Sequence, residues 1–254
     1  MATPVPPANF RFMGESEERY VQLGDEMVAR IGTVVDLAAC RRVVDIGCGY
    51  GRIGAAFLRS GFAGRYDGFD MLRPHLEWCN AHLGNRRFRY HYMDIHSERY
   101  NPSGTLQQTD VRFDVPAGTA DLVVLTSVFT HMYPDDIVHY LHECRRLVSP
   151  KGRVYATFFV LDDVQASRRN HYELPHELTP FCRYMSPDEP LHVIGYTQEW
   201  LREQFAATGF RLDGEVRHGA WSGEPDAFDF QDTVVLAPEG AGPSDAGRTR
   251  WWRR

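Results

Sequence analysis

The feature that most constrains the fold is a glycine-rich turn that joins a short apolar segment to a helical one. Residues 43–46 have the composition of a buried strand, and residues 52–59 have the spacing of a helix. Between them, Gly47, Gly49 and Gly51 occupy alternate positions, where the absence of side chains lets a ligand approach the backbone closely. Amide groups at the start of the helix would point at that ligand. The turn therefore predicts a strand–turn–helix unit with a binding site at its centre.

Strand-like and helix-like segments alternate along most of the chain. Further strands are predicted at residues 66–70, 88–94, 121–126, 154–159, 211–217 and 232–237. Helices are predicted at residues 15–37 and 73–83, from a cap at Asp135 or Asp136 to residue 148, and at residues 197–207. This alternation implies mostly parallel strands joined by right-handed crossovers, with helices on both faces of the sheet. The predicted fold class is therefore α/β.

The length of 254 residues suits one large α/β domain, to which we assign residues 15–238. Residues 1–14 are predicted to be irregular, and the Gly/Pro-rich residues 239–254 to form a flexible tail. Residues 161–195 carry several prolines, histidines and tyrosines, and we interpret them as an insertion with little regular structure that acts as a lid. We interpret the basic and aromatic residues 248–254 as a solvated end rather than a contact for membrane or nucleic acid.

Composition and charge limit the partners and the compartment. The net charge of −6 lowers the expectation of nucleic acid as a partner, because such proteins usually need a basic stripe. No apolar run approaches the roughly 20 residues that span a bilayer, and the start of the chain lacks the pattern of a secretory signal. The cysteines are scattered and show no ligand-like spacing with histidine: Cys40, Cys48, Cys79, Cys144 and Cys182. We therefore predict no metal site, no disulfide framework and a cytoplasmic location.

Carboxylates stand at the predicted ends of the first three strands. Asp45 could accept from amides of the glycine turn or from the ammonium group of an amino acid. Asp70, at the tip of the second strand, could accept from two ribose hydroxyls. Asp94, at the end of the third strand, could accept from the amino group of adenine. Together the three residues describe a nucleoside that carries a positively charged tail.

Two other interpretations of the turn remain open. A dinucleotide fingerprint would require a third glycine where Arg52 stands, and pyrophosphate would lie badly beside Asp45. A purely structural turn with surface aspartates would explain the glycines but not the acidic ends of two further strands.

The sequence resembles the class I, Rossmann-fold S-adenosylmethionine-dependent methyltransferases, of the bacterial small-molecule type. The resemblance lies in five segments: residues 43–51, 68–70, 93–94, 125–131 and 149–152. Arg153 stands where a second glycine often follows the last of these segments. It extends over residues 15–238 and is specific for the cofactor rather than for the acceptor. It implies a seven-stranded, mostly parallel sheet in the order 3-2-1-4-5-7-6, with strand 7 antiparallel.

The resemblance also implies that S-adenosyl-L-methionine is the cofactor. The residues expected to bind it are Asp45, Gly47, Cys48, Gly49, Gly51, Asp70, Met71, Met93, Asp94 and Thr126.

The acceptor is expected at the carboxyl ends of the strands, where open α/β sheets bind ligands. His131 follows the fourth strand directly and is our candidate general base, since histidine can take a proton near neutral pH. It could equally anchor the start of the next helix. Phe129, His218 and Trp221 are predicted to contact the acceptor with it, although core packing is the usual role of a single aromatic residue.

The predicted function is methyl transfer to a small-molecule acceptor, at the oxygen of a sugar or natural-product hydroxyl or carboxylate. Residues 126–129 read Thr-Ser-Val-Phe and lack the [DN]-P-P-[YF] pattern of enzymes that methylate nucleobase amino groups. A nicotinamide-dependent oxidoreductase on the same fold and a non-catalytic cofactor-binding module are the alternatives. The sequence gives no oligomeric state.

Overall fold

Strand β1 (Arg42–Ile46) lies near the middle of the main sheet and is packed on both faces. Val43 belongs to one hydrophobic cluster, whereas Val44 and Ile46 belong to another, because successive side chains of a strand point to opposite faces. The computed structural model describes residues 3–11, 15–166, 168 and 170–242.

The sheet has seven strands in the order β10-β11-β5-β4-β1-β2-β3. The six besides β1 are β2 (Arg65–Asp70), β3 (Phe88–Tyr92), β4 (Ala120–Leu125), β5 (Val148–Phe158), β10 (Phe210–Leu212) and β11 (Asp232–Pro238). β11 runs antiparallel to both of its neighbours, and the strands from β3 to β5 are parallel to one another. Counted along the chain, this is the predicted order 3-2-1-4-5-7-6 with strand 7 antiparallel, and that prediction is confirmed.

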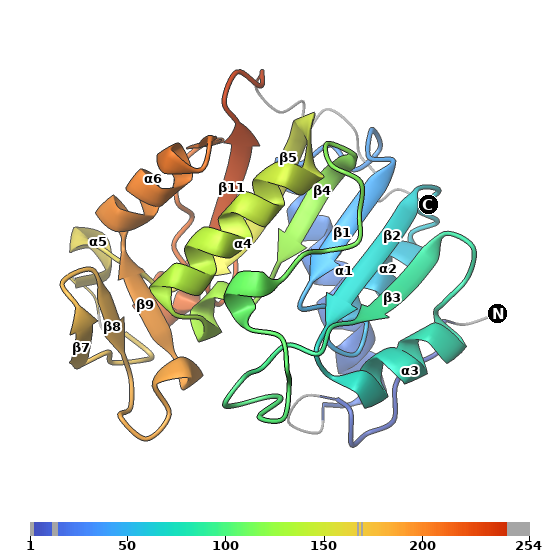
Figure 1. Cartoon of the computed structure of the whole chain (residues 1–254), viewed down its shortest axis with the longest axis horizontal. Helices are drawn as coiled ribbons and strands as arrows, with labels where there is room; N and C mark the ends of the chain where they lie inside the picture. The colour runs from blue at the N-terminus through green and yellow to red at the C-terminus, as the bar shows by residue number, and fades with distance from the viewer. Residues whose placement is uncertain (1–2, 12–14, 167, 169, 243–254) are drawn as a thin grey trace.

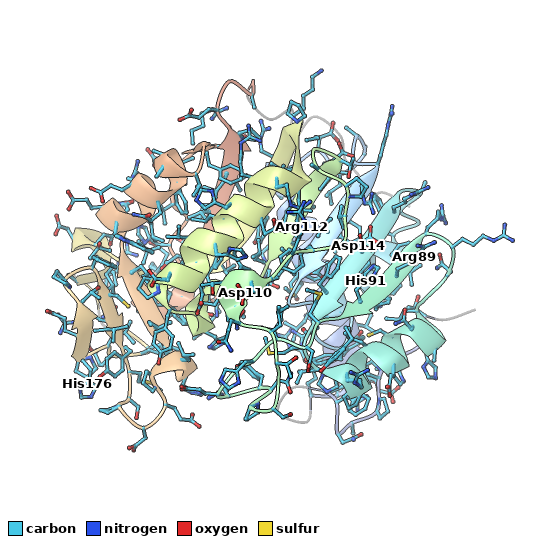
Figure 2. All side chains as sticks on the ribbon, viewed as in Figure 1. Arg89, His91, Asp110, Arg112, Asp114 and His176 are labelled. Carbon is cyan, nitrogen blue, oxygen red and sulfur yellow. The ribbon has the colours of Figure 1, made fainter. Side chains whose placement is uncertain are left out.

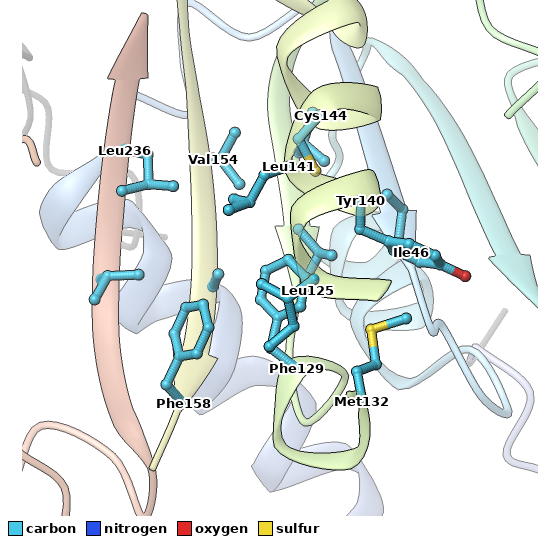
Figure 3. Close-up of a cluster of buried hydrophobic side chains, with 14 of the residues drawn as sticks. Ile46, Leu125, Phe129, Met132, Tyr140, Leu141, Cys144, Val154, Phe158 and Leu236 are labelled. Carbon is cyan, nitrogen blue, oxygen red and sulfur yellow. The ribbon is translucent and has the colours of Figure 1, made fainter. Parts of the chain in front are cut away.

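Helices cover both faces of the sheet, as predicted (Figure 1). On one face lie α1 (Glu17–Val34), α2 (Arg52–Arg59) and α3 (Arg73–His82). On the other lie α4 (Pro134–Leu147) and α6 (Gln198–Ala207). Figure 3 shows the core beneath α4, where Leu141 and Cys144 meet Val154 of β5.

Two helix starts differ from the prediction. α1 begins at Glu17 because the hydroxyl of Ser16 accepts the backbone N–H of Arg19, which makes Ser16 the cap. α4 begins at Pro134, so neither Asp135 nor Asp136 is its cap. The carboxylate of Asp136 instead accepts the backbone N–H of Tyr133 one turn earlier.

Several strand ends also differ. The predicted strand 88–94 ends at Tyr92, where pairing with β2 stops. The predicted strand 211–217 is a strand only over Phe210–Leu212, and Arg217 adds an isolated bridge. The predicted strand 154–159 begins earlier, because Val148 of β5 already pairs with Ala120, and it ends at Phe158.

The insertion has more regular structure than predicted. A second sheet has the order β6-β9-β8-β7, and α5 (Asp163–Ala166) follows its first strand. Its strands are β6 (Val160–Leu161), β7 (His176–Thr179), β8 (Cys182–Tyr184) and β9 (Ile194–Thr197). The prediction of little regular structure was wrong because these strands are too short to show periodicity, and burial of Cys182, Ile194 and Tyr196 against the main core holds them.

A loop with one turn of 3-10 helix (Gln108–Asp110), rather than an α-helix, joins β3 to β4. Val111, Phe113 and Val115 are buried in the core, whereas the alternate Arg112 and Asp114 face outward. Figure 2 labels these two side chains, together with Arg89 and His91 of β3. In the part of the chain that the structure describes, no helix is long and apolar enough to cross a membrane.

Candidate active site

A cavity of about 610 Å³ lies at the carboxyl ends of β1, β2 and β4. It is lined by the residues that follow each of these strands, which are 47–50, 71–72 and 126–128. Its volume falls within the roughly 300–1,000 Å³ typical of small-molecule sites. The topology therefore places the cavity at the edge that the sequence predicted.

The glycine turn has a backbone that only glycine tolerates at key positions. Gly47 has a φ of 74°, and a Cβ atom there would meet Cγ2 of Val128 at 2.4 Å. Gly51 has a φ of 78°, and a Cβ there would meet Sγ of Cys79 at 2.8 Å. The backbone N–H of Gly47 donates to the carbonyl oxygen of Phe69 at 2.8 Å, which ties the turn to β2. The turn is therefore rigid and closely packed from behind.

Asp70 connects the turn to the segment after β2. One carboxylate oxygen accepts the backbone N–H of Gly49 at 2.7 Å, and the other accepts that of Leu72 at 2.9 Å. Burial raises the pKa of Asp70, although these backbone hydrogen bonds oppose the rise. Each oxygen keeps a further lone pair, so the carboxylate can still accept from a ligand in the cavity.

Asp45 is fully buried at the base of the cavity. The hydroxyl of Tyr66 donates to its Oδ2, whereas Oδ1 has no hydrogen-bond partner among the described residues. Burial raises the pKa of Asp45 to about 7. An unpartnered carboxylate oxygen of this kind suits a cationic donor.

His131 lies in the 3-10 helix Phe129–His131 and lines the cavity. Its Nδ1 is 2.8 Å from the carbonyl oxygen of Leu191, so Nδ1 carries the proton and donates it. Nε2 is therefore the unprotonated nitrogen. Burial lowers the pKa of His131 to about 4, which keeps the ring neutral at physiological pH.

Most of the predicted cofactor residues come together in this cavity. Those that line it are Asp45, Gly47, Cys48, Gly49, Asp70, Met71, Met93 and Thr126. Gly51 packs behind the turn rather than on the cavity wall.

Asp94 lies outside the lining, although Met93 and Ile95 belong to it. Its carboxylate accepts from the hydroxyls of Tyr92 at 2.6 Å and Thr105 at 2.8 Å. The chain leaves β3 before this residue, so its side chain is used to fix the following loop. Contact of Asp94 with adenine stays a prediction.

The predicted acceptor wall is wrong for Phe129 and Trp221, because both are fully buried and neither lines the cavity. Phe129 stacks on Phe158 with ring centroids 4.9 Å apart (Figure 3). Trp221 lies behind Phe159, and its Nε1–H donates to Asp232 at 2.7 Å. The sequence shows aromatic residues near the site but not which of them face inward.

His218 is also outside the lining. Its Nε2 is 3.4 Å from Asp162 and its Nδ1 is 3.6 Å from Asp232. The carboxylates of Asp232 and Asp162 raise its pKa, Asp232 more strongly. His218 therefore links the insertion to β11 and lies outside the wall to which we assigned it.

Several other side chains that line the cavity were not predicted from the sequence. They come from the β3–β4 connection, the insertion and the segment before β11: Arg99, Tyr100, Phe159, Tyr172, His192, Phe230 and Gln231. Tyr172 stands in the insertion already assigned to the catalytic face, but nothing local distinguishes Phe230 or Gln231.

The five cysteines are free and buried. Within the described ranges, no three His, Cys, Asp or Glu side chains are grouped so as to hold a metal ion.

Residues 44–156 match the family model of a methyltransferase domain. This match includes the glycine turn, Asp70 and His131, and the observed strand order is that of the class I fold. Over these residues the chain is therefore similar to a methyltransferase domain, and its sheet has the strand order of the class I, Rossmann-like fold.

Several solved structures share this fold. A 1,6-didemethyltoxoflavin-N1-methyltransferase from Burkholderia thailandensis, with its substrate and S-adenosylhomocysteine bound, has 17% identity and a TM-score of 0.53, with 87% of this chain and 79% of that one covered. An O-methyltransferase family protein from the same organism has 15% identity and a TM-score of 0.54, with 89% and 58% covered. The PH0226 protein of Pyrococcus horikoshii OT3 has 14% identity and a TM-score of 0.58, with 91% and 95% covered. At these identities the likeness establishes the fold.

Proposed function

We propose that this protein transfers the methyl group of S-adenosylmethionine to an oxygen atom of a small-molecule acceptor. One observation carries the proposal: a single cavity contains both the predicted cofactor residues and the neutral side chain of His131. Donor and acceptor could therefore meet inside one space, which positions the reacting atoms before reaction.

The residues of the turn fit the cofactor. Gly47 has no room for a side chain behind it, so its backbone can lie against the ligand. Asp70 would accept from the ribose hydroxyls, and the unpartnered oxygen of Asp45 would accept from the ammonium group. When bound, the cofactor supplies a methyl group on a cationic sulfur to a nucleophile in line with it.

Oxygen is the favoured acceptor atom because of the tautomer of His131. The carbonyl of Leu191 holds the proton on Nδ1, which leaves the lone pair of Nε2 for an acceptor hydroxyl. With a pKa of about 4, the ring also stays uncharged beside a cationic cofactor. His131 would thus orient the hydroxyl and accept its proton as the oxygen attacks.

The insertion at residues 161–195 would act as the lid. It contributes Tyr172, His192 and Val193 to the cavity lining, and it supplies the carbonyl that orients His131. Arg99, on the β3–β4 connection, pairs with Glu189 of the insertion at 2.8 Å. These contacts would exclude water from the acceptor end.

Of two proteins with a similar fold, one is described as an N1-methyltransferase and the other as an O-methyltransferase family protein. The acceptor atom must therefore be decided by experiment. Thermal unfolding with S-adenosylhomocysteine and with NAD(P) tests the cofactor, because a ligand that binds the native state raises its stability. We expect stabilisation by the first and none by the second; the reverse would make the protein an oxidoreductase. Binding without any methylated product from cell extract would favour a non-catalytic module.

A further inference from the structure

Gln231 lines the cavity directly before β11 and belongs to a small polar network. Its Oε1 accepts from the hydroxyl of Ser127 at 3.1 Å and from that of Thr157 at 2.7 Å. The backbone N–H of Ser127 in turn donates to the Thr157 hydroxyl at 2.8 Å. The network thus joins the ends of β4 and β5 to the start of β11.

The hydrogen bonds of the network use the carbonyl end of the Gln231 amide. The Thr157 hydroxyl accepts from the backbone N–H of Ser127 and donates its own proton to Oε1 of Gln231. The hydroxyl of Ser127 donates to the same oxygen. The Nε2 group is therefore the free end, and it brings two N–H donors to a residue that lines the cavity.

The backbone of Ser127, which takes part in this network, has an unfavourable conformation. Its φ of 56° makes it the only non-glycine with a positive φ among the described residues. Such a backbone usually costs about 1–3 kcal/mol and persists only where surrounding contacts impose it. Both its backbone N–H and its hydroxyl are used in the network around Gln231.

The walls beside Gln231 are aromatic. Phe159 and Phe230 each meet Tyr172 edge to face, with ring centroids 5.7 Å apart in both pairs. All three rings line the cavity. Flat apolar walls of this kind favour a flat aromatic ligand, because stacked and edge contacts between rings add to the burial of area.

We propose that the acceptor is a planar aromatic compound with an oxygen atom, such as a ring carbonyl, that receives a hydrogen bond from Nε2 of Gln231. This inference rests on the proposed function and identifies its acceptor class. Nε2 of Gln231 would donate a hydrogen bond to the acceptor oxygen, and Nε2 of His131 would accept one from the hydroxyl that is methylated. An acceptor without the oxygen leaves unpaired the N–H donor that would bond to it, which weakens its binding.

Two flat bicyclic phenols test this directly. 7-Hydroxycoumarin carries a ring carbonyl and 2-naphthol does not. Calorimetric titration of each into the chain saturated with S-adenosylhomocysteine should show about fivefold tighter binding of 7-hydroxycoumarin, as expected for one neutral hydrogen bond.

Two variants of Gln231 test its N–H donors separately from the contacts of its oxygen with Ser127 and Thr157. Gln231→Met removes the donors without adding charge and should abolish the preference. Gln231→Glu keeps an oxygen for Ser127 and Thr157 but replaces the donors, so the affinity for 7-hydroxycoumarin should fall by more than about tenfold through repulsion. Gln198→Glu, the same change on α6 outside the cavity lining, should keep the wild-type preference.

Affinity for S-adenosylhomocysteine, measured on each variant, separates the two proposals. It should stay within about twofold of wild type, because Gln231 is not among the residues proposed to hold the cofactor. Equal binding of the two phenols, no binding of either, or a preference that survives Gln231→Met would overturn this inference and leave the proposed function standing. A wild-type chain that binds no S-adenosylhomocysteine would overturn both.

Discussion

The two ends of the cavity are built in different ways. At the cofactor end, backbone atoms of the glycine turn and two carboxylates are fixed by hydrogen bonds between adjacent strands, such as Gly49 to Asp70. At the acceptor end, side chains such as Tyr172 and Gln231 come from segments far apart in the sequence. A site of the first kind suits one constant ligand. A site of the second kind can change its ligand through single side-chain substitutions while the fold stays the same.

The largest expected effect concerns His131. His131→Ala should lower kcat/KM for the acceptor by about 10²- to 10⁴-fold, the usual contribution of a positioned acid or base. The affinity for S-adenosylhomocysteine should change by less than about twofold, because His131 belongs to the acceptor end. Steady-state kinetics with the acceptor and calorimetry with S-adenosylhomocysteine together test whether the two ends of the cavity act separately. Wild-type turnover in this variant would eliminate the base role, and His176→Ala, outside the lining, is the matched control.

The pH dependence of the free energy of unfolding tests the state of Asp45 at the cofactor end of the cavity. Its pKa is raised from 3.8 to about 7, so the folded state favours the protonated carboxyl group. That contribution to stability is present below about pH 4 and is lost as the pH rises to about 7, at about 1.4 kcal/mol for each unit of pKa shift. The difference in the free energy of unfolding between Asp45→Asn and wild type should therefore grow by a few kcal/mol over this range, in favour of the variant.

Denaturant unfolding of both proteins at several pH values measures this difference. The exposed Asp226 offers a matched control, since Asp226→Asn should follow wild type. A constant difference between Asp45→Asn and wild type would show that Asp45 is not held in its protonated form.

Gly47 tests whether close packing behind the turn matters for the cofactor. Gly47→Ala must place a Cβ 2.4 Å from Val128 at a positive φ, so the turn has to shift. We expect the affinity for S-adenosylhomocysteine to fall by at least about tenfold, because the shifted turn no longer holds its backbone in the position that meets the ligand. Gly61→Ala has a similar φ of 75° but open space around its Cβ, and it should keep the wild-type affinity. Equal affinities in both variants would mean that the turn does not contact the ligand.

The smallest effect is expected for the ion pair between the insertion and the β3–β4 connection. Glu189→Ala removes the partner of Arg99, but the Glu189 side chain is 65% exposed. The free energy of unfolding should therefore fall by less than about 1 kcal/mol, as for surface ion pairs generally. Glu177→Ala, which breaks an exposed pair within the insertion, is the control. A much larger loss for Glu189→Ala alone would show that this pair holds the two segments together.

The same contrast explains what the sequence could predict. The glycine turn and Asp70 lie within one strand–turn–helix–strand unit, so their spacing along the chain already indicates their geometry. The alternation of elements indicated mostly parallel strands, whereas the strand order came from the family resemblance alone. Asp94 was placed less well, because the end of β3 depends on where pairing with β2 stops.

Residues of the acceptor end depend on contacts distant in the sequence. Gln231 reaches the cavity because β11 pairs with β5, which brings it to Thr157 and Ser127. Phe129 and Phe159 both follow strands and both are buried, yet only Phe159 lines the cavity. No local pattern separates such cases. The basic and aromatic residues 248–254 lie outside the described residues, and their interpretation stays a prediction.

A crystal structure with S-adenosylhomocysteine bound would test the central claim most directly. We predict ligand density along residues 47–51, with the ribose hydroxyls against Asp70 and the sulfur facing the space in front of His131. Density elsewhere, or a turn filled by side chains of the protein itself, would contradict the assignment of this cavity to methyl transfer.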